Sequence, residues 1–227
     1  MDLNLAATNI LNYTSPQVVK AVESIHSASE REFLNAAHRY VSQHVQPIYT
    51  VDEFQPVSVT LEKGRGACSQ RIACVEAFAR AAGIPTRVQV LWVTGKFWYP
   101  RFALWTHPFI PQRIMLLWAQ FYVDNTWLDF SEVVAPLHQL ATQSEHGFTN
   151  ADETLFDAVA IRPVDFSNRM QKCECNNDYD LSGYVVGDGG IFDSRDDALK
   201  AYGSFQHTLR GLAFERLFGN QASWQPA

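Results

Sequence analysis

Residues 64–87 read GRGACSQRIACVEAFARAAGIPTR, and this stretch decides the fold. Its first two glycines permit a tight turn that leads into a helix beginning at about Cys68. Gly83 is placed to end that helix, and Pro85 prevents its continuation. The buried stripe of the helix is formed by apolar residues at helical spacing, namely Ile72, Val75, Phe78, Ala79 and Ala82. The stretch therefore predicts a glycine turn, a buried helix and an exit into the next element.

The residues on either side predict helices before this stretch and strands after it. Ser15 and Ser29 stand where helix N-caps are expected, and Ser29 has a glutamate three residues later as in a capping box. Three strands rich in β-branched and aromatic residues are predicted over 86–93, 114–123 and 127–130, with a turn at 124–126. This order predicts an α+β fold in which N-terminal helices pack on an antiparallel β-sheet.

The signals weaken towards the C-terminus. The segment AVAIRPVDF at 158–166 is compatible with one more strand, and GDGG at 187–190 is typical of a turn. A final helix is predicted from about Ser194 to Gly219. We interpret residues 1–164 as the core of the fold and residues 165–227 as a C-terminal extension packed on the same domain.

Composition limits the possible partners. A net charge of −6 argues against a nucleic-acid-binding surface, and 47% hydrophobic residues allow a sizeable core. Because the N-terminal residues do not resemble a secretory signal and no apolar run reaches the length of a membrane span, a cytoplasmic protein without a membrane partner is expected. The four cysteines are Cys68, Cys74, Cys173 and Cys175. Their spacing predicts no disulfide framework and no metal site, and no cofactor motif is present.

Cys68 is the strongest candidate for chemistry. A thiol at a helix N-terminus ionises more easily, and the thiolate is the nucleophile. The unpaired backbone amides of the first helical turn can also stabilise an oxyanion during acyl transfer. A buried core cysteine is the competing interpretation, and local spacing does not separate the two. Cys74 lies in the middle of the predicted helix and is expected to belong to the core.

At this point the chain resembles the transglutaminase-like superfamily. The resemblance rests on the lead-in FLNAAHRYVSQHV, on the motif G-x-C-x5-C-x-E-A-F-A-R-A-A-G-I-P-T-R and on WAQFYVDNTWLDFS, and it covers roughly residues 30–135. It implies a papain-related fold with a Cys-His-Asp catalytic unit, in which a histidine on the second strand accepts the thiol proton and an acid on the third orients the histidine.

The chain departs from this pattern at the histidine. The usual motif is His-x-Trp-x-Glu, and aligning it on Trp118 and Trp127 puts Leu116 at the histidine, Gln120 at the glutamate and Ser131 at the acid. Leucine cannot accept a proton. Only the nucleophile of the catalytic unit is therefore matched directly.

Three explanations stay open. In the first, His107 enters the site and is oriented by Asp129, with a β-bulge shifting the local register. In the second, the Cys68 thiolate attacks an activated thioester without a general base. In the third, the protein has lost catalysis and keeps the pocket as a binding or scaffold module. His138 and His146 are ranked below His107, and His207 is expected to face solvent.

The leading functional hypothesis is cysteine-dependent acyl transfer, either amide hydrolysis or amide formation through a thioester at Cys68. We assign Trp98, Tyr99, Trp118 and Gln120 to the binding of a small-molecule or peptide acyl substrate, free or bound to a carrier. Within the aromatic segment 92–105, Trp92 and Trp105 are expected in the core, and residues 97–102 stay open between a cleft and the core. The substrate, the acyl acceptor and the oligomeric state do not follow from the sequence.

Overall fold

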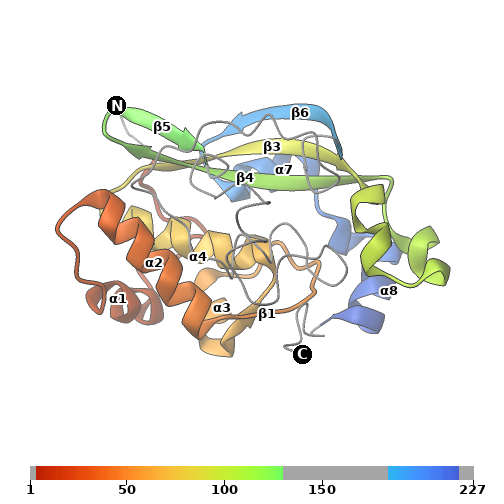
Figure 1. Cartoon of the computed structure of the whole chain (residues 1–227), viewed down its shortest axis with the longest axis horizontal. Coiled ribbons are helices and arrows are strands. Elements are labelled where there is room, and N and C mark those ends of the chain that lie inside the picture. Colours follow the sequence, from red (N-terminus) through yellow and green to blue (C-terminus); the bar gives the residue numbers. More distant parts are fainter. Residues whose placement is uncertain (1–3, 130–183, 220–227) are drawn as a thin grey trace, which may run out of the picture.

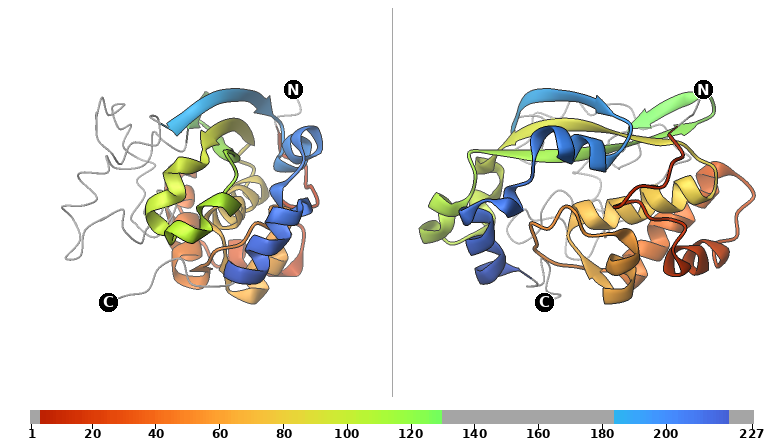
Figure 2. Two further views of the ribbon diagram at one scale, coloured as in Figure 1. Left: turned by 90° about the vertical axis from the view of Figure 1, so that its right-hand side faces the viewer. Right: turned by 180° about the vertical axis from the view of Figure 1, so that it is seen from behind.

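The computed structural model describes residues 4–129 and 184–219 of the chain. Its α-helices lie on one side of a four-stranded antiparallel sheet, as Figures 1 and 2 show, which confirms the expected α+β class. The helices are α1 (Pro16–Glu23), α2 (Glu30–His44), α3 (Val57–Lys63), α4 (Cys68–Ala81), α7 (Arg195–Tyr202) and α8 (Leu209–Phe218). The strands of the sheet are β3 (Thr86–Thr94), β4 (Arg113–Val123), β5 (Thr126–Asp129) and β6 (Val185–Phe192). The predicted strand at 158–166 lies outside the described residues.

Helix α4 is the central element of the helical layer. It begins at Cys68, as predicted, and every residue from 70 to 80 is buried because α1, α2, α3 and β4 pack around it. Burial therefore extends well beyond the predicted apolar stripe and includes Arg71, Glu76 and Arg80. Gly83 follows the helix with φ +83°, a left-handed conformation that glycine adopts without strain.

A short helix and a two-residue strand pair place the start of α4. Helix α3, which the sequence did not predict, ends at Gly64, which has φ +60°. Strands β1 (Gln46–Pro47) and β2 (Arg65–Gly66) then pair in parallel. The segment that follows α2 is thereby hydrogen-bonded to the turn that precedes Cys68. The predicted glycine turn is fixed by this strand pair and lies between α3 and α4.

The sheet has the order β5-β4-β3-β6. Strands β3 and β4 pair without interruption from Thr86↔Phe121 to Thr94↔Arg113. The turn between β4 and β5 has positive φ at Asp124 (52°) and Asn125 (60°), as in a two-residue hairpin turn. The three strands predicted in this region are thus confirmed, with ends shifted by one residue.

Strand β6 corrects the interpretation of GDGG as a turn. These residues lie within β6, which pairs with β3 through register shifts between Val90 and Leu91 and between Trp92 and Val93. A Cβ atom added at Gly189 would lie 2.6 Å from Val90 Cγ1 and 3.1 Å from Trp92 Nε1. Glycine is required because the strand passes close over two side chains of β3, which the turn signal alone could not reveal.

The C-terminal helix is broken where continuous helix was expected. Ser194 caps α7 by accepting a hydrogen bond from Asp197 N, and α7 ends at Tyr202. Gly203 has φ +76° and is followed by the 3₁₀ helix η5 (Phe205–His207) and by α8. After the break the chain leads away from the sheet to α8, at one end of the molecule (Figure 2), and residues 204–214 lie in the neighbourhood of Cys68.

Candidate active site

Cys68 is the first residue of α4 and is half-buried. The N-cap residue, Ala67, has no polar side chain to accept hydrogen bonds from the first turn. Gln70 supports the turn instead, because its Oε1 accepts a hydrogen bond from Ala67 N (2.9 Å) and its Nε2 donates to Asp52 O (2.6 Å). The start of the helix is thereby fixed to the loop at 49–53.

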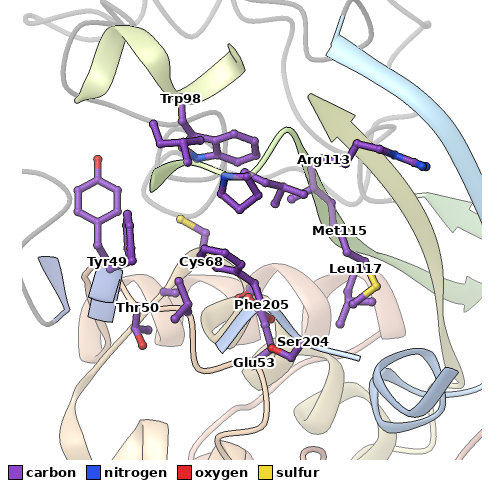
Figure 3. Close-up of a pocket in the computed structure, with 18 of the residues that line it drawn as sticks. Tyr49, Thr50, Glu53, Cys68, Trp98, Arg113, Met115, Leu117, Ser204 and Phe205 are labelled. Atoms are coloured by element: carbon purple, nitrogen blue, oxygen red, sulfur yellow. Dashed lines mark hydrogen bonds between the residues drawn. The ribbon is translucent and has the colours of Figure 1, made fainter. Parts of the chain in front are cut away.

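The Cys68 side chain opens into a cavity of about 450 Å³ (Figure 3). The cavity lies between the start of α4, the loop at 48–53, strand β4 and the segment 202–214. Its lining is mainly apolar, with contributions that include Trp98, Phe102, Met115, Leu117, Phe205 and Phe214. The volume and composition are typical of a site for a small organic ligand.

Glu53 is a cavity residue that the sequence analysis did not identify. Its Oε1 accepts a hydrogen bond from Ser69 Oγ at 2.9 Å, and its backbone N donates to Gln206 Oε1 at 3.1 Å. Burial raises the pKa of the Glu53 carboxyl above its ordinary value, while Arg195 and the Ser69 hydrogen bond lower it in part. No motif marks this glutamate, because the folding of two distant segments creates its surroundings.

A Glu53→Gln variant is expected to gain stability relative to the wild type as pH rises. The raised folded-state pKa means that the folded protein holds this proton more tightly than the unfolded chain does, so the wild type loses stability from about pH 4.5 upwards. Glutamine keeps the acceptor for Ser69 without the charge. Urea unfolding between pH 4 and 8 measures the difference. Parallel pH profiles for the two proteins would contradict the expectation.

Cys74 lies one and a half turns further along α4 and is fully buried. Burial raises the pKa of its thiol to about 12, with smaller opposing effects from Arg71 and Arg195. The expectation that Cys74 belongs to the core is confirmed. Cys173 and Cys175 lie outside the described residues.

His107 lies in the 3₁₀ helix η2 (Leu104–Phe109). Its Nε2 is 3.0 Å from Tyr99 O and 3.1 Å from Phe102 O, so this nitrogen carries a proton and donates to carbonyl groups. The ring stacks on Tyr99 with centroids 4.2 Å apart. These contacts hold His107 within its own loop, and it is not among the residues that line the Cys68 cavity. Its role as a base stays a prediction.

Strand β4 has no histidine at any position between Arg113 and Val123. Met115 pairs with Trp92, whose ring contacts Tyr202 of α7, so alternation puts Met115 and Leu117 on the face that carries the helices. Figure 3 shows both side chains at the cavity with Cys68. Leu116 also borders the cavity, but the same alternation places its side chain on the opposite face of the sheet.

The substrate-binding residues predicted from the sequence do not all lie at the cavity. Trp98 lines the cavity, whereas Tyr99, Trp118 and Gln120 are not among its lining residues. Gln120 is buried, accepts a hydrogen bond from Arg87 Nε at 2.6 Å and faces Asp129 of β5 in the strand register. The described structure thus brings Cys68 and Trp98 together, and the remaining substrate and catalytic assignments stay predictions. His138, His146 and Ser131 lie outside the described residues.

The aromatic segment contains one wrong expectation and one open alternative that the structure decides. Phe97, which was left open between a cleft and the core, is buried in the core, where its ring contacts Trp98 and Tyr184. Trp105 was placed in the core but is 65% exposed, because η2 projects from the end of the sheet (Figure 1). Aromatic composition alone does not distinguish the two environments.

A buried ion pair lies behind the cavity and connects α4 to α7. Arg195 Nε donates to Glu76 Oε1 at 2.8 Å, and both side chains are almost fully buried. Glu76 Oε2 has no hydrogen-bond partner among the described residues. The pair joins residues 119 positions apart in the chain, so its formation requires the C-terminal segment to be in place.

Residues 17–131 match the family model of the transglutaminase-like superfamily, and they make up 115 of the 227 residues. The chain therefore belongs to the transglutaminase-like superfamily, a family with a cysteine-protease-like fold. The match ends before β6, α7 and α8. No curated protein and no solved structure matches the chain.

Within residues 4–129 and 184–219, no group of three or more His, Cys, Asp or Glu side chains is placed to hold a metal ion. Over the same ranges, none of the helices has both the length and the apolar character needed to cross a bilayer.

Proposed function

We propose that the protein is a cysteine-dependent acyltransferase that forms a thioester at Cys68 with an activated acyl donor. The observation that carries the proposal is the position of the Cys68 thiol, at the first turn of a buried helix and open to a partly enclosed, largely apolar cavity. Membership of the transglutaminase-like superfamily supports the same chemistry.

The absence of histidine among the described lining residues favours an activated donor over an unactivated amide. Amide cleavage needs a general acid to protonate the leaving nitrogen, whereas a thioester or an activated ester releases a stable anion without that assistance. The Cys68 thiolate attacks the carbonyl carbon, and the C–S bond forms as the donor's leaving group departs. Backbone N–H groups of the first turn are placed to stabilise the oxyanion. Water or an amine then takes the acyl group and releases Cys68.

A second candidate is a binding module that has kept the cavity without catalysis. The same lack of histidine in the described lining favours it. The two candidates differ in the reactivity of Cys68, because a binding module has no requirement for a nucleophilic thiolate.

Cys68 is expected to react with iodoacetamide at pH 7 at least a hundredfold faster than Cys74. Cys68 is half-buried at a helix N-terminus, whereas Cys74 is fully buried and its pKa is raised to about 12. Peptide mass spectrometry at timed intervals gives both rates in one sample, and N-acetylcysteine provides the reference for an unperturbed thiol. Labelling of Cys68 more slowly than the reference thiol would count against the acyltransferase proposal and favour the binding module.

A further inference from the structure

The segment 202–214 forms one wall of the Cys68 cavity. Tyr202, Phe205 and Phe214 line the cavity from this side, opposite Trp98 and the start of α4. The segment lies beyond residue 131, where the match to the family ends. This wall is thus formed by residues that lie outside the part of the chain matched by the family model.

Polar contacts hold this wall against the loop at 49–53. The Glu215 carboxylate accepts hydrogen bonds from Thr50 Oγ1 (3.0 Å) and Val51 N (2.9 Å). Gln206 Oε1 accepts one from Glu53 N at 3.1 Å. Phe214 also contacts Phe102 edge-to-face at 5.7 Å between ring centroids. The two sides of the cavity are therefore joined, and the wall aromatics are presented to the space beside Cys68.

The charges at the cavity do not favour an anionic ligand. The Glu53 carboxyl borders the cavity next to Ser69, and its negative form would repel a ligand carboxylate. Among the described lining residues the one cation is Arg113, which is exposed and lies over the Trp92 ring at 4.8 Å. Figure 3 shows its guanidinium directed away from Cys68. In the described part of the lining, no cation is therefore placed to bind a ligand carboxylate beside Cys68.

From this arrangement we infer that the cavity binds an uncharged, medium-length aliphatic acyl group, with Phe205 and Phe214 as its specificity-determining residues. The inference rests on the proposed acyltransferase function for the covalent step and on the cavity alone for binding. With a p-nitrophenyl ester as the acyl donor, the Cys68 thiolate attacks the ester carbonyl. The C–S bond forms, and the C–O bond breaks to release p-nitrophenolate. Water then adds to the thioester and returns the carboxylic acid and the free thiol.

The test compares p-nitrophenyl acetate, butyrate, hexanoate and hemiglutarate as donors to the full chain. Nitrophenolate release gives the rate of Cys68 acylation, mass spectrometry locates the adduct, and N-acetylcysteine corrects for the intrinsic reactivity of each ester. Each pair of added methylenes is expected to raise the corrected rate about tenfold, since each buried methylene contributes about 0.8 kcal/mol. The hemiglutarate, similar in length to the hexanoate but anionic, is expected to react at least tenfold more slowly. Corrected rates independent of chain length, or equal rates for hexanoate and hemiglutarate, would overturn the inference.

Variants of the two phenylalanines test whether they set the preference for the longer acyl chain. Phe205→Ala and Phe214→Ala are each expected to lower the hexanoate-to-acetate ratio by tenfold or more, because each removes apolar surface from the cavity. Leu212→Ala is the matched control, since Leu212 lies on α8, is 60% exposed and does not line the cavity. An unchanged ratio in both phenylalanine variants would exclude their role.

A binding measurement separates this inference from the proposed function. In a Cys68→Ala variant, hexanamide should raise the melting temperature or quench tryptophan fluorescence, and glutaramate should do neither at the same concentration. If no ester acylates Cys68 but hexanamide binds selectively, the acyltransferase proposal fails and the apolar ligand site stands. If hexanamide and glutaramate bind equally or not at all, the ligand inference fails.

Discussion

An Arg195→Met variant is expected to lose about 3–5 kcal/mol of the free energy of unfolding. The substitution leaves Glu76 buried without its cation, and Glu76 Oε2 already has no hydrogen-bond partner among the described residues. A buried carboxylate without a counter-charge carries a large desolvation cost. Chemical denaturation at pH 7 followed by circular dichroism measures the loss.

Two further variants make this test specific. Arg210→Met removes the same side chain from an exposed position on α8, and its effect should stay within about 0.5 kcal/mol. The double variant Glu76→Leu/Arg195→Met should recover most of the loss, because it removes both charges together. A loss below about 1 kcal/mol in Arg195→Met would show that the pair does not hold α7 on α4.

A Cys68→Ala variant is expected to lose acylation by p-nitrophenyl hexanoate by about a thousandfold or more, since Cys68 is the one thiol among the described lining residues of the cavity. The matched control is Cys74→Ala in the same helix. Cys74 is fully buried and its pKa is raised to about 12, so its removal should leave the acyl adduct at Cys68. Intact-mass spectrometry detects the adduct in each protein. Persistence of a single adduct in Cys68→Ala would assign the nucleophile to another residue.

Much of the fold could be predicted because its determinants are local. The start of α4 at Cys68, the glycine that follows the helix and the hairpin turn at Asp124 and Asn125 depend on residues close together in the sequence. The membership of the transglutaminase-like superfamily was predicted from the same local motif. Strand β6 was missed because Gly189 is required by its close approach to Val90 and Trp92, a contact that the GDGG run alone does not indicate.

The residues of the candidate site likewise divide into those placed by local sequence and those placed by the tertiary structure. Cys68 could be identified from its position at a helix start, a property of a few consecutive residues. Glu53, Phe205 and Phe214 could not, because they meet at the cavity from segments that lie far apart in the sequence. The Glu76–Arg195 pair likewise joins distant segments. The sequence by itself determined that Cys68 stands at the start of a helix, since the signals for a helix start are local. Only the tertiary structure decided what surrounds it, since burial and charge at the cavity arise from segments that meet on folding.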